Sequence, residues 1–307
     1  MTKDPRGSRQ DGNGRKQSEV EQFWDATPCD SGVSDLEVGS EDYFLDIEMQ
    51  RYQLQPHIRE LLCALNLAGK RVLEVGTGVG TDARLMIAQG ASYCGINVDA
   101  GSARITHRAL EVFGLCGEVR QASALEIPYP DASFDIVYSF GVLHHIPSVG
   151  DAVIEINRVL KPGGRLVVML YNRRSINYAI EIRHLRKWGL RLLGLPGVLR
   201  TLGTLGFPVT KLHRHLELRK SLGTMTDEEW LSRNTDGPDN PYSRVYGRAE
   251  TETLLSDFLQ VEQHVRFFDY RHWGPIGKII PPKLRSALGA RWGWHRIAVA
   301  RKPLSPS

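Results

Sequence analysis

The sequence lacks several features that would narrow its class. Among its 307 residues, no stretch offers the roughly 20 uninterrupted apolar residues that a membrane span requires. The first residues, MTKDPRGSRQDGNGRKQSE, are too polar for a signal peptide. We therefore expect a cytoplasmic, soluble protein without stable membrane insertion. The four cysteines Cys29, Cys63, Cys94 and Cys116 show neither CxxC nor Cys/His ligand spacing, so we expect neither a disulfide framework nor a metal site.

The N-terminal part of the chain changes character near residue 22. Earlier positions are almost devoid of apolar residues, and such a segment cannot offset the entropy of ordering. We predict a disordered tail over residues 1–22. Residues 23–69 are richer in aromatic side chains and then place apolar residues three and four apart, with an interruption at Pro56. This pattern predicts a helical cap whose helices break at the proline.

Short apolar runs alternate with helical windows after Gly69. The predicted strands are RVLEV, SYCGINV, EVRQAS, FDIVYSF and RLVVMLY, followed near the C-terminus by VEQHVRFFDY and HRIAVARK. Strands with few polar interruptions are typical of a parallel sheet covered on both faces. We predict an α/β fold with a doubly wound, seven-stranded, mostly parallel sheet, built from residues 70–171 and 248–307.

Residues 172–247 break this rhythm with basic amphipathic helices, and we predict that they form an inserted lid. Between residues 171 and 223 there are eleven Lys and Arg residues and two Glu residues. Thr226 and Glu229 have the spacing of a capping box. The basic helices fit a solvated surface, a pocket for an anionic or lipid-like small molecule, or a contact with an anionic membrane. We expect no nucleic-acid partner, because no aromatic and basic binding module is visible.

The stretch VLEVGTGVGTD, residues 72–82, follows the first predicted strand. A glycine-rich turn at this place allows close approach of a ligand, and ligands of open α/β sheets bind at the carboxyl ends of the strands. A dinucleotide fingerprint needs its third glycine three residues after the second, whereas Gly76, Gly78 and Gly80 are evenly spaced by two. This argues against a nicotinamide oxidoreductase. The neighbouring Glu74 and Asp82 favour a cationic ligand over a pyrophosphate.

Four blocks in order resemble the class I S-adenosylmethionine-dependent methyltransferases, in their small-molecule, type 11-like branch. The blocks are VLEVGTGVG, YCGINVDAGS, QASALEIPYPDASFDIV and LHHIPSVGDAVIEINRVLKPGGRLVV, and they cover about residues 71–171. The resemblance implies a Rossmann-like fold, S-adenosylmethionine as cofactor and in-line methyl transfer from the sulfonium to a small-molecule acceptor. A protein that binds the cofactor or S-adenosylhomocysteine without catalysis, and a lipid-like or macromolecular acceptor, are the alternatives.

The resemblance also implies a cofactor-binding set. In this family the acid at the position of Glu74 orders the glycine loop and the amino-acid end of the cofactor. An acid normally holds the ribose at the tip of the second strand; here Asn97 stands there with Asp99 two residues later, so either or both hold the ribose. Adenine recognition falls on Ser123, Ala124 and Leu125, where Ser123 replaces the usual Asp. The full expected set is Tyr43, Arg51, Glu74, Gly76, Gly78, Gly80, Asp82, Asn97, Asp99, Ser123, Ala124, Leu125 and Phe140.

The remaining candidates concern the methyl acceptor. His144 and His145 follow the fourth predicted strand, where the resemblance places the reactive methyl group, and we predict His144 as a general base and His145 as a substrate contact. Packing in the protein interior is the alternative for each. Tyr43 and Arg51 either close over the methionine end of the cofactor or pack between helices. Tyr171, Asn172 and Arg173, at the exit of the fifth strand, either face substrate or form a solvated loop.

Overall fold

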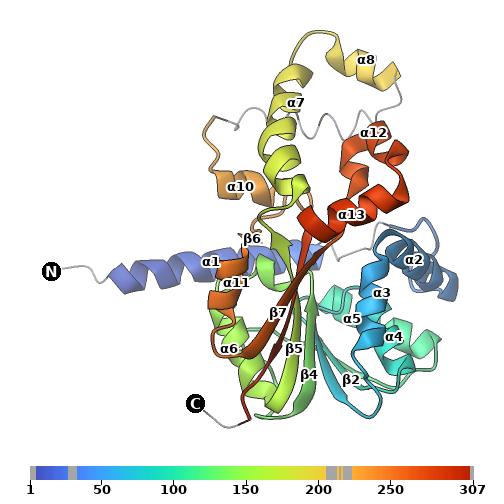
Figure 1. Cartoon of the computed structure of the whole chain (residues 1–307), viewed down its shortest axis with the longest axis vertical. Coiled ribbons are helices and arrows are strands. Elements are labelled where there is room, and N and C mark those ends of the chain that lie inside the picture. Colours follow the sequence, from blue (N-terminus) through green and yellow to red (C-terminus); the bar gives the residue numbers. More distant parts are fainter. Residues whose placement is uncertain (1–4, 27–32, 205–212, 214–215, 217–222, 305–307) are drawn as a thin grey trace. The chain divides into compact units, whose positions relative to one another are not determined.

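The alternating pattern after Gly69 forms one β-sheet in the computed structural model, which describes residues 5–26, 33–204, 213, 216 and 223–304 (Figure 1). The chain divides into two compact units. Unit 1 comprises Met1–Leu170, Tyr246–His264 and His295–Ser307, and unit 2 comprises Tyr171–Val245 and Val265–Trp294.

The predicted α/β class is confirmed. The strands run in the order β3-β2-β1-β4-β5-β8-β7, with the two-residue β6 paired to β5. Strand β1 pairs in parallel with β2 and β4, β2 pairs with β3 and β4 pairs with β5, also in parallel. The bounds are β1 (Arg71–Val75), β2 (Ser92–Asn97), β3 (Glu118–Gln121), β4 (Phe134–Phe140), β5 (Leu160–Asn172), β6 (Val245–Tyr246), β7 (Leu259–Arg266) and β8 (His295–Arg301).

Helices of unit 1 cover both faces of the sheet, because successive side chains of a strand point to opposite faces. Val72 and Ile136 belong to one hydrophobic cluster, whereas Leu73 and Val137 belong to another. In Figure 1, α3, α4 and α5 lie on one side of the sheet and α6 and α11 on the other. The bounds are α2 (Glu41–Leu54), α3 (Pro56–Ala64), α4 (Thr81–Ala88), α5 (Ala100–Val112), the 3₁₀ turn η1 (Leu143–His145), α6 (Val149–Val159) and α11 (Arg248–Leu254).

Local sequence signals set several helix ends. The break predicted at Pro56 is confirmed, since α2 ends at Leu54 and α3 begins at Pro56; proline at the first position loses no intrahelical hydrogen bond. Ser40 caps α2 by accepting a hydrogen bond from the Tyr43 amide. Together these signals fix helix α2, which carries Arg51.

Helix α1 (Pro5–Ala26) occupies most of the segment for which we expected a disordered tail. The composition of this segment did not indicate a helix, because the stretch is polar and contains few apolar side chains. Two of those few, Val20 and Trp24, lie four residues apart on one helix face, and Val20 is buried. The helix therefore gains its order from contacts elsewhere in unit 1.

Unit 2 contains residues 172–245 of the predicted lid together with residues 265–294, which we had expected to belong to the C-terminal core. The capping box of Thr226 and Glu229 is confirmed at the start of α10, and the buried Trp230 indole donates a hydrogen bond to the Ile182 carbonyl at 2.7 Å. The bounds are the π-helix η2 (Asn177–Leu185), α7 (Arg186–Leu193), α8 (Val198–Thr204), α10 (Asp227–Ser232), the 3₁₀ turn η3 (Tyr270–Trp273), α12 (Gly274–Ile279) and α13 (Pro282–Trp292).

Within the described residues, no helix combines the length and apolarity needed to cross a membrane, and no cluster of His, Cys, Asp and Glu is arranged to hold a metal ion. Cys63, Cys94 and Cys116 are free thiols. Cys29 lies outside the described residues, as do the lid residues Lys211, Arg214, Arg219 and Lys220.

Candidate functional site

A cavity of about 990 Å³, counting its open mouth, lies in unit 1 where β1, β2 and β4 end. Parallel strands present their carboxyl ends at one edge of the sheet, so the loops that follow them meet there. Eleven of the residues expected to bind cofactor or substrate line it: Arg51, Glu74, Gly76, Gly78, Asp82, Asn97, Asp99, Ser123, Ala124, Phe140 and His145.

The glycine loop forms one wall of this cavity, and its glycines are required for different reasons. Gly76 has a φ of +83°, and a Cβ atom there would lie 2.1 Å from Val142 Cγ2. Gly78 has a φ of +55°, yet a Cβ atom there would meet nothing within 4 Å. Gly76 is therefore needed for packing within the protein, whereas Gly78 leaves open space beside the main chain. Gly80 caps α4 in the left-handed region and does not line the cavity.

Glu74 lies near the end of β1, opposite Gly95 on β2 and Tyr138 on β4. Its buried carboxylate accepts a hydrogen bond of 2.6 Å from the Tyr93 hydroxyl. Burial and the nearby Asp82 carboxylate raise the pKa of Glu74 well above its ordinary value, because both disfavour a second negative charge. The surroundings of Glu74 thus disfavour its ionisation.

Asp82, in the first turn of α4, is buried at the centre of a hydrogen-bond network. Arg51 donates through Nε to Oδ1 at 3.2 Å and through Nη2 to Oδ2 at 2.8 Å. The hydroxyls of Tyr52 and Tyr138 donate at 3.0 and 2.9 Å. The network joins the cap helix α2 to α4 and to the sheet.

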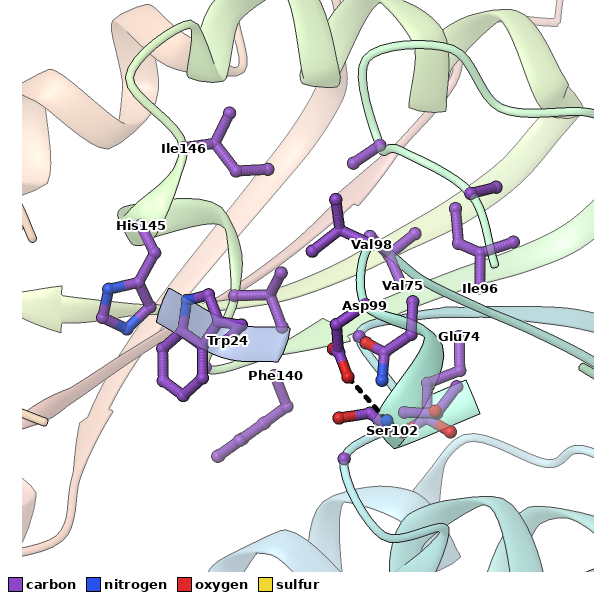
Figure 2. Close-up of a pocket in the computed structure, with 18 of the residues that line it drawn as sticks. Trp24, Glu74, Val75, Ile96, Val98, Asp99, Ser102, Phe140, His145 and Ile146 are labelled. Carbon is purple, nitrogen blue, oxygen red and sulfur yellow. Dashed lines mark hydrogen bonds between the residues drawn. The ribbon is translucent and has the colours of Figure 1, made fainter. Parts of the chain in front are cut away.

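The tip of β2 supplies Asn97 and Asp99. Asp99 caps α5 by accepting a hydrogen bond of 2.6 Å from the Ser102 amide (Figure 2). The Asn97 side chain is buried, and its Nδ2 atom has no hydrogen-bond partner among the described residues. A buried amide donor without a partner is costly, so this atom marks a position where a polar ligand group fits.

The loop after β3 supplies Ser123 and Ala124. Both line the cavity, whereas Leu125 does not; the Leu125 amide instead donates to Ser123 Oγ at 3.2 Å. This hydrogen bond forms a turn within the chain that holds Ser123 in place.

Aromatic side chains line another part of the cavity. Trp24 and His145 have ring centroids 5.2 Å apart in an edge-to-face arrangement, and Figure 2 shows them near Phe140 and below Ile146. Sequence reasoning missed the contribution of α1, namely Gln17, Val20 and Trp24. The spacing of Val20 and Trp24 was the only available signal.

His144 and His145 differ in position although they are neighbours in η1. His145 lines the cavity, whereas His144 is fully buried and does not. Burial, with smaller contributions from His145 and His295, lowers the pKa of His144 well below its ordinary value. The predicted general base His144 therefore packs in the interior, and of the two histidines His145 is the one that reaches the cavity.

Four further expected contacts lie elsewhere. Tyr43 is buried against Phe44, with ring centroids 5.3 Å apart. Tyr171 stacks on Trp294 and donates to Asp236 at 2.9 Å, Asn172 donates to the Gly293 carbonyl at 2.8 Å, and Arg173 donates to the Val245 carbonyl at 3.1 Å. None of the four lines the cavity, and the contacts given for the last three lie within unit 2.

Residues 73–168 match a family model described as a methyltransferase domain. The chain is 38% identical over 104 residues to the 27-O-demethylrifamycin SV methyltransferase of Amycolatopsis mediterranei, which covers 33% of this chain and 38% of that protein. It is 28% identical over 178 residues to the fatty-acid O-methyltransferase of Mycolicibacterium smegmatis, covering 57% of this chain and 61% of that protein. The chain thus spans less than two thirds of these relatives.

A SAM-dependent methyltransferase of Thermotoga maritima has the same fold, with a TM-score of 0.52, 16% identity and coverage of 94% of this chain and 99% of that one. Fold and cavity together define an α/β domain of the class I type with an open cavity at the carboxyl ends of its strands. Residues 73–168 are a methyltransferase domain of this class, whose cofactor is S-adenosylmethionine.

The lining residues fit that cofactor. The space beside Gly78 accommodates a ligand close to the main chain, and the Asn97 amide offers a donor that no described residue uses. The carboxyl groups of Glu74, Asp82 and Asp99 line the same cavity and offer hydrogen-bond acceptors to polar groups of a ligand.

Proposed function

We propose that this chain is an S-adenosylmethionine-dependent methyltransferase that acts on a small, largely apolar acceptor. The observation that carries this proposal is the cavity in which a bare glycine loop, an unpartnered Asn97 amide and an aromatic wall occur together. The names of two relatives, a rifamycin methyltransferase and a fatty-acid O-methyltransferase, support an apolar acceptor.

We assign the cofactor contacts to the polar part of the cavity. Asn97 and Asp99 would hold the ribose hydroxyls, since a carboxylate retains acceptor capacity after capping a helix. Ser123 and the backbone at Ala124 would contact the adenine. Glu74 and the main chain at Gly78 would hold the amino-acid end of the cofactor. Arg51 would also contact this end, and its ion pair with Asp82 holds it in place. When bound, the cofactor supplies a methyl group that its sulfonium has already activated.

We assign the acceptor to the aromatic wall. Trp24, Phe140 and Ile146 offer an apolar surface that excludes water from an acceptor lying against them. His145 replaces His144 as the proposed proton acceptor, because it reaches the cavity and imidazole is well suited to take a proton near neutral pH. The main contribution of the protein is then to align the acceptor with the methyl group.

The experiment is to incubate the protein and S-adenosylmethionine carrying a trideuteromethyl group with a cell extract, and to search the extract by mass spectrometry. The proposal predicts labelled small molecules of low polarity that are absent when Gly78→Val replaces the native protein. Label confined to RNA or protein would contradict the acceptor class. Cofactor binding without any labelled product would favour the non-catalytic alternative.

A further inference from the structure

A row of apolar side chains on unit 2 faces outward. Leu185, Trp188, Leu192 and Leu195 are each between 47% and 62% exposed. Leu185 is the last residue of η2, Trp188 and Leu192 lie on one face of α7, and Leu195 follows two residues after α7 ends. We call these four residues the exposed stripe.

The opposite side of the same helix is anchored to unit 2. Ile182 and Leu190 are buried, the Ile182 carbonyl accepts the hydrogen bond from Trp230, and Lys187 pairs with Asp227 at 2.8 Å. The exposed stripe is therefore not the side that the helix uses for its own packing. Large apolar residues gathered in this way usually mark an interaction surface.

Positive charge borders the exposed stripe. Residues 177–204 contain five Lys and Arg residues and a single acidic residue, Glu181, which pairs with Arg186. Arg183 and Arg191 are exposed. Arg191, three residues after Trp188, lies along one edge of the stripe, whereas Lys187 pairs with Asp227 on the anchored side. A surface with an apolar centre and a basic edge is complementary to the interface of an anionic bilayer.

We propose that the exposed stripe rests on the surface of a membrane that contains anionic lipid. Trp188 and the leucines enter the interfacial region, where an indole is especially favourable, while Arg191 contacts lipid headgroups. The same charge pattern disfavours a second copy of this chain as the occupant, because two such stripes would bring like charges together. The inference stands independently of the methyl-transfer proposal.

The experiment is cosedimentation of the full chain with vesicles of phosphatidylcholine alone and with vesicles in which about a third of the lipid is phosphatidylglycerol. We expect binding to the anionic vesicles that weakens with added salt. The double variant Trp188→Ser, Leu192→Ser should reduce vesicle affinity by at least about tenfold, because two interfacial side chains are lost. Ile154→Ser removes a comparably exposed side chain from α6 and should leave binding unchanged.

A second measurement guards against misfolding of the double variant. Lipids brominated in their acyl chains should quench part of the native fluorescence, and Trp188→Phe should abolish that part while retaining an aromatic anchor. No cosedimentation with anionic vesicles, equal binding by the double variant, or quenching that persists in Trp188→Phe would overturn the proposal. Dimers that disappear in the double variant, without vesicle binding, would assign the stripe to a second copy instead.

Discussion

Arg51 on α2 and Asp82 on α4 form a two-point ion pair, with Arg51 Nη2 lying 2.8 Å from Asp82 Oδ2 and Nε 3.2 Å from Oδ1. The pair couples a helix that precedes the sheet to the helix that follows the glycine loop. Asp82 is buried, and its carboxylate accepts further hydrogen bonds from the hydroxyls of Tyr52 and Tyr138. The ion pair therefore links the position of α2 to the helix that follows the glycine loop.

Arg51→Met should lower the free energy of unfolding by on the order of 2 kcal/mol, less than the roughly 3–5 kcal/mol for a fully buried pair, because the Arg51 side chain is 19% exposed. Denaturant unfolding measures the change. Arg59→Met, at an exposed position on α3, is the matched control and should have little effect. Equal stability of the two variants would show that the ion pair does not anchor α2.

Gly76 and Gly78 should respond differently to substitution. Gly76→Ala places a methyl group against Val142 and should destabilise the fold by about 3 kcal/mol through overpacking and strain. Gly78→Ala meets open space and should cost only about 1 kcal/mol, from its positive φ. Gly78→Val should leave a folded protein that no longer binds S-adenosylhomocysteine, because its side chain fills ligand space. Thermal melting measures the loss of stability, and calorimetry measures the loss of S-adenosylhomocysteine binding. Normal binding by Gly78→Val would show that the glycine loop is not part of the cofactor site.

His145 and His144 should affect different measurements. His145→Gln should lower turnover about a hundredfold, at the low end of general-base contributions, while S-adenosylhomocysteine affinity is retained. His144→Gln should act mainly on stability, because His144 is buried. Steady-state kinetics on the labelled acceptor, beside thermal melting of each variant, tests this. A turnover defect in a stable His144→Gln protein, with His145→Gln fully active, would reverse the assignment.

Glu74 should make stability depend on pH. Its folded-state pKa is raised well above 4.5, so above about that pH the folded protein holds a proton that the unfolded chain has released. Stability contributed by this group is therefore lost as pH rises toward the folded pKa. Glu74→Gln does not titrate, so its stability relative to the native protein should increase as the pH rises above about 5. Denaturation curves across this range measure the difference, and a constant difference would mean that Glu74 titrates normally.

The β-sheet could be predicted from the sequence because several features of the pattern indicate the same strands. Strands buried on both faces must be apolar throughout. The helix break at Pro56 follows from the proline backbone, and the helix start at Thr226 follows from two side chains at capping-box spacing. The glycine loop was predictable because a positive φ such as that of Gly78 favours glycine.

What the sequence could not show depends on tertiary contacts. Helix α1 is polar in composition, and its order rests on the placement of Val20 and Trp24 in unit 1. His144 and His145 are identical residues at adjacent positions, and only the geometry of η1 sends one inward and the other to the cavity. Residues 265–294 follow a core strand in sequence but belong to unit 2, which is a consequence of folding that no local pattern records.

The most direct test of the account is isothermal titration of the native protein and of Asn97→Leu with S-adenosylhomocysteine, with NAD as the comparison ligand. The account predicts one binding site for S-adenosylhomocysteine and none for NAD. It also predicts an affinity about tenfold lower in Asn97→Leu, from the loss of a buried hydrogen bond, while Asn157→Leu on α6 binds normally. Binding of NAD without S-adenosylhomocysteine, or an unchanged affinity in Asn97→Leu, would contradict it.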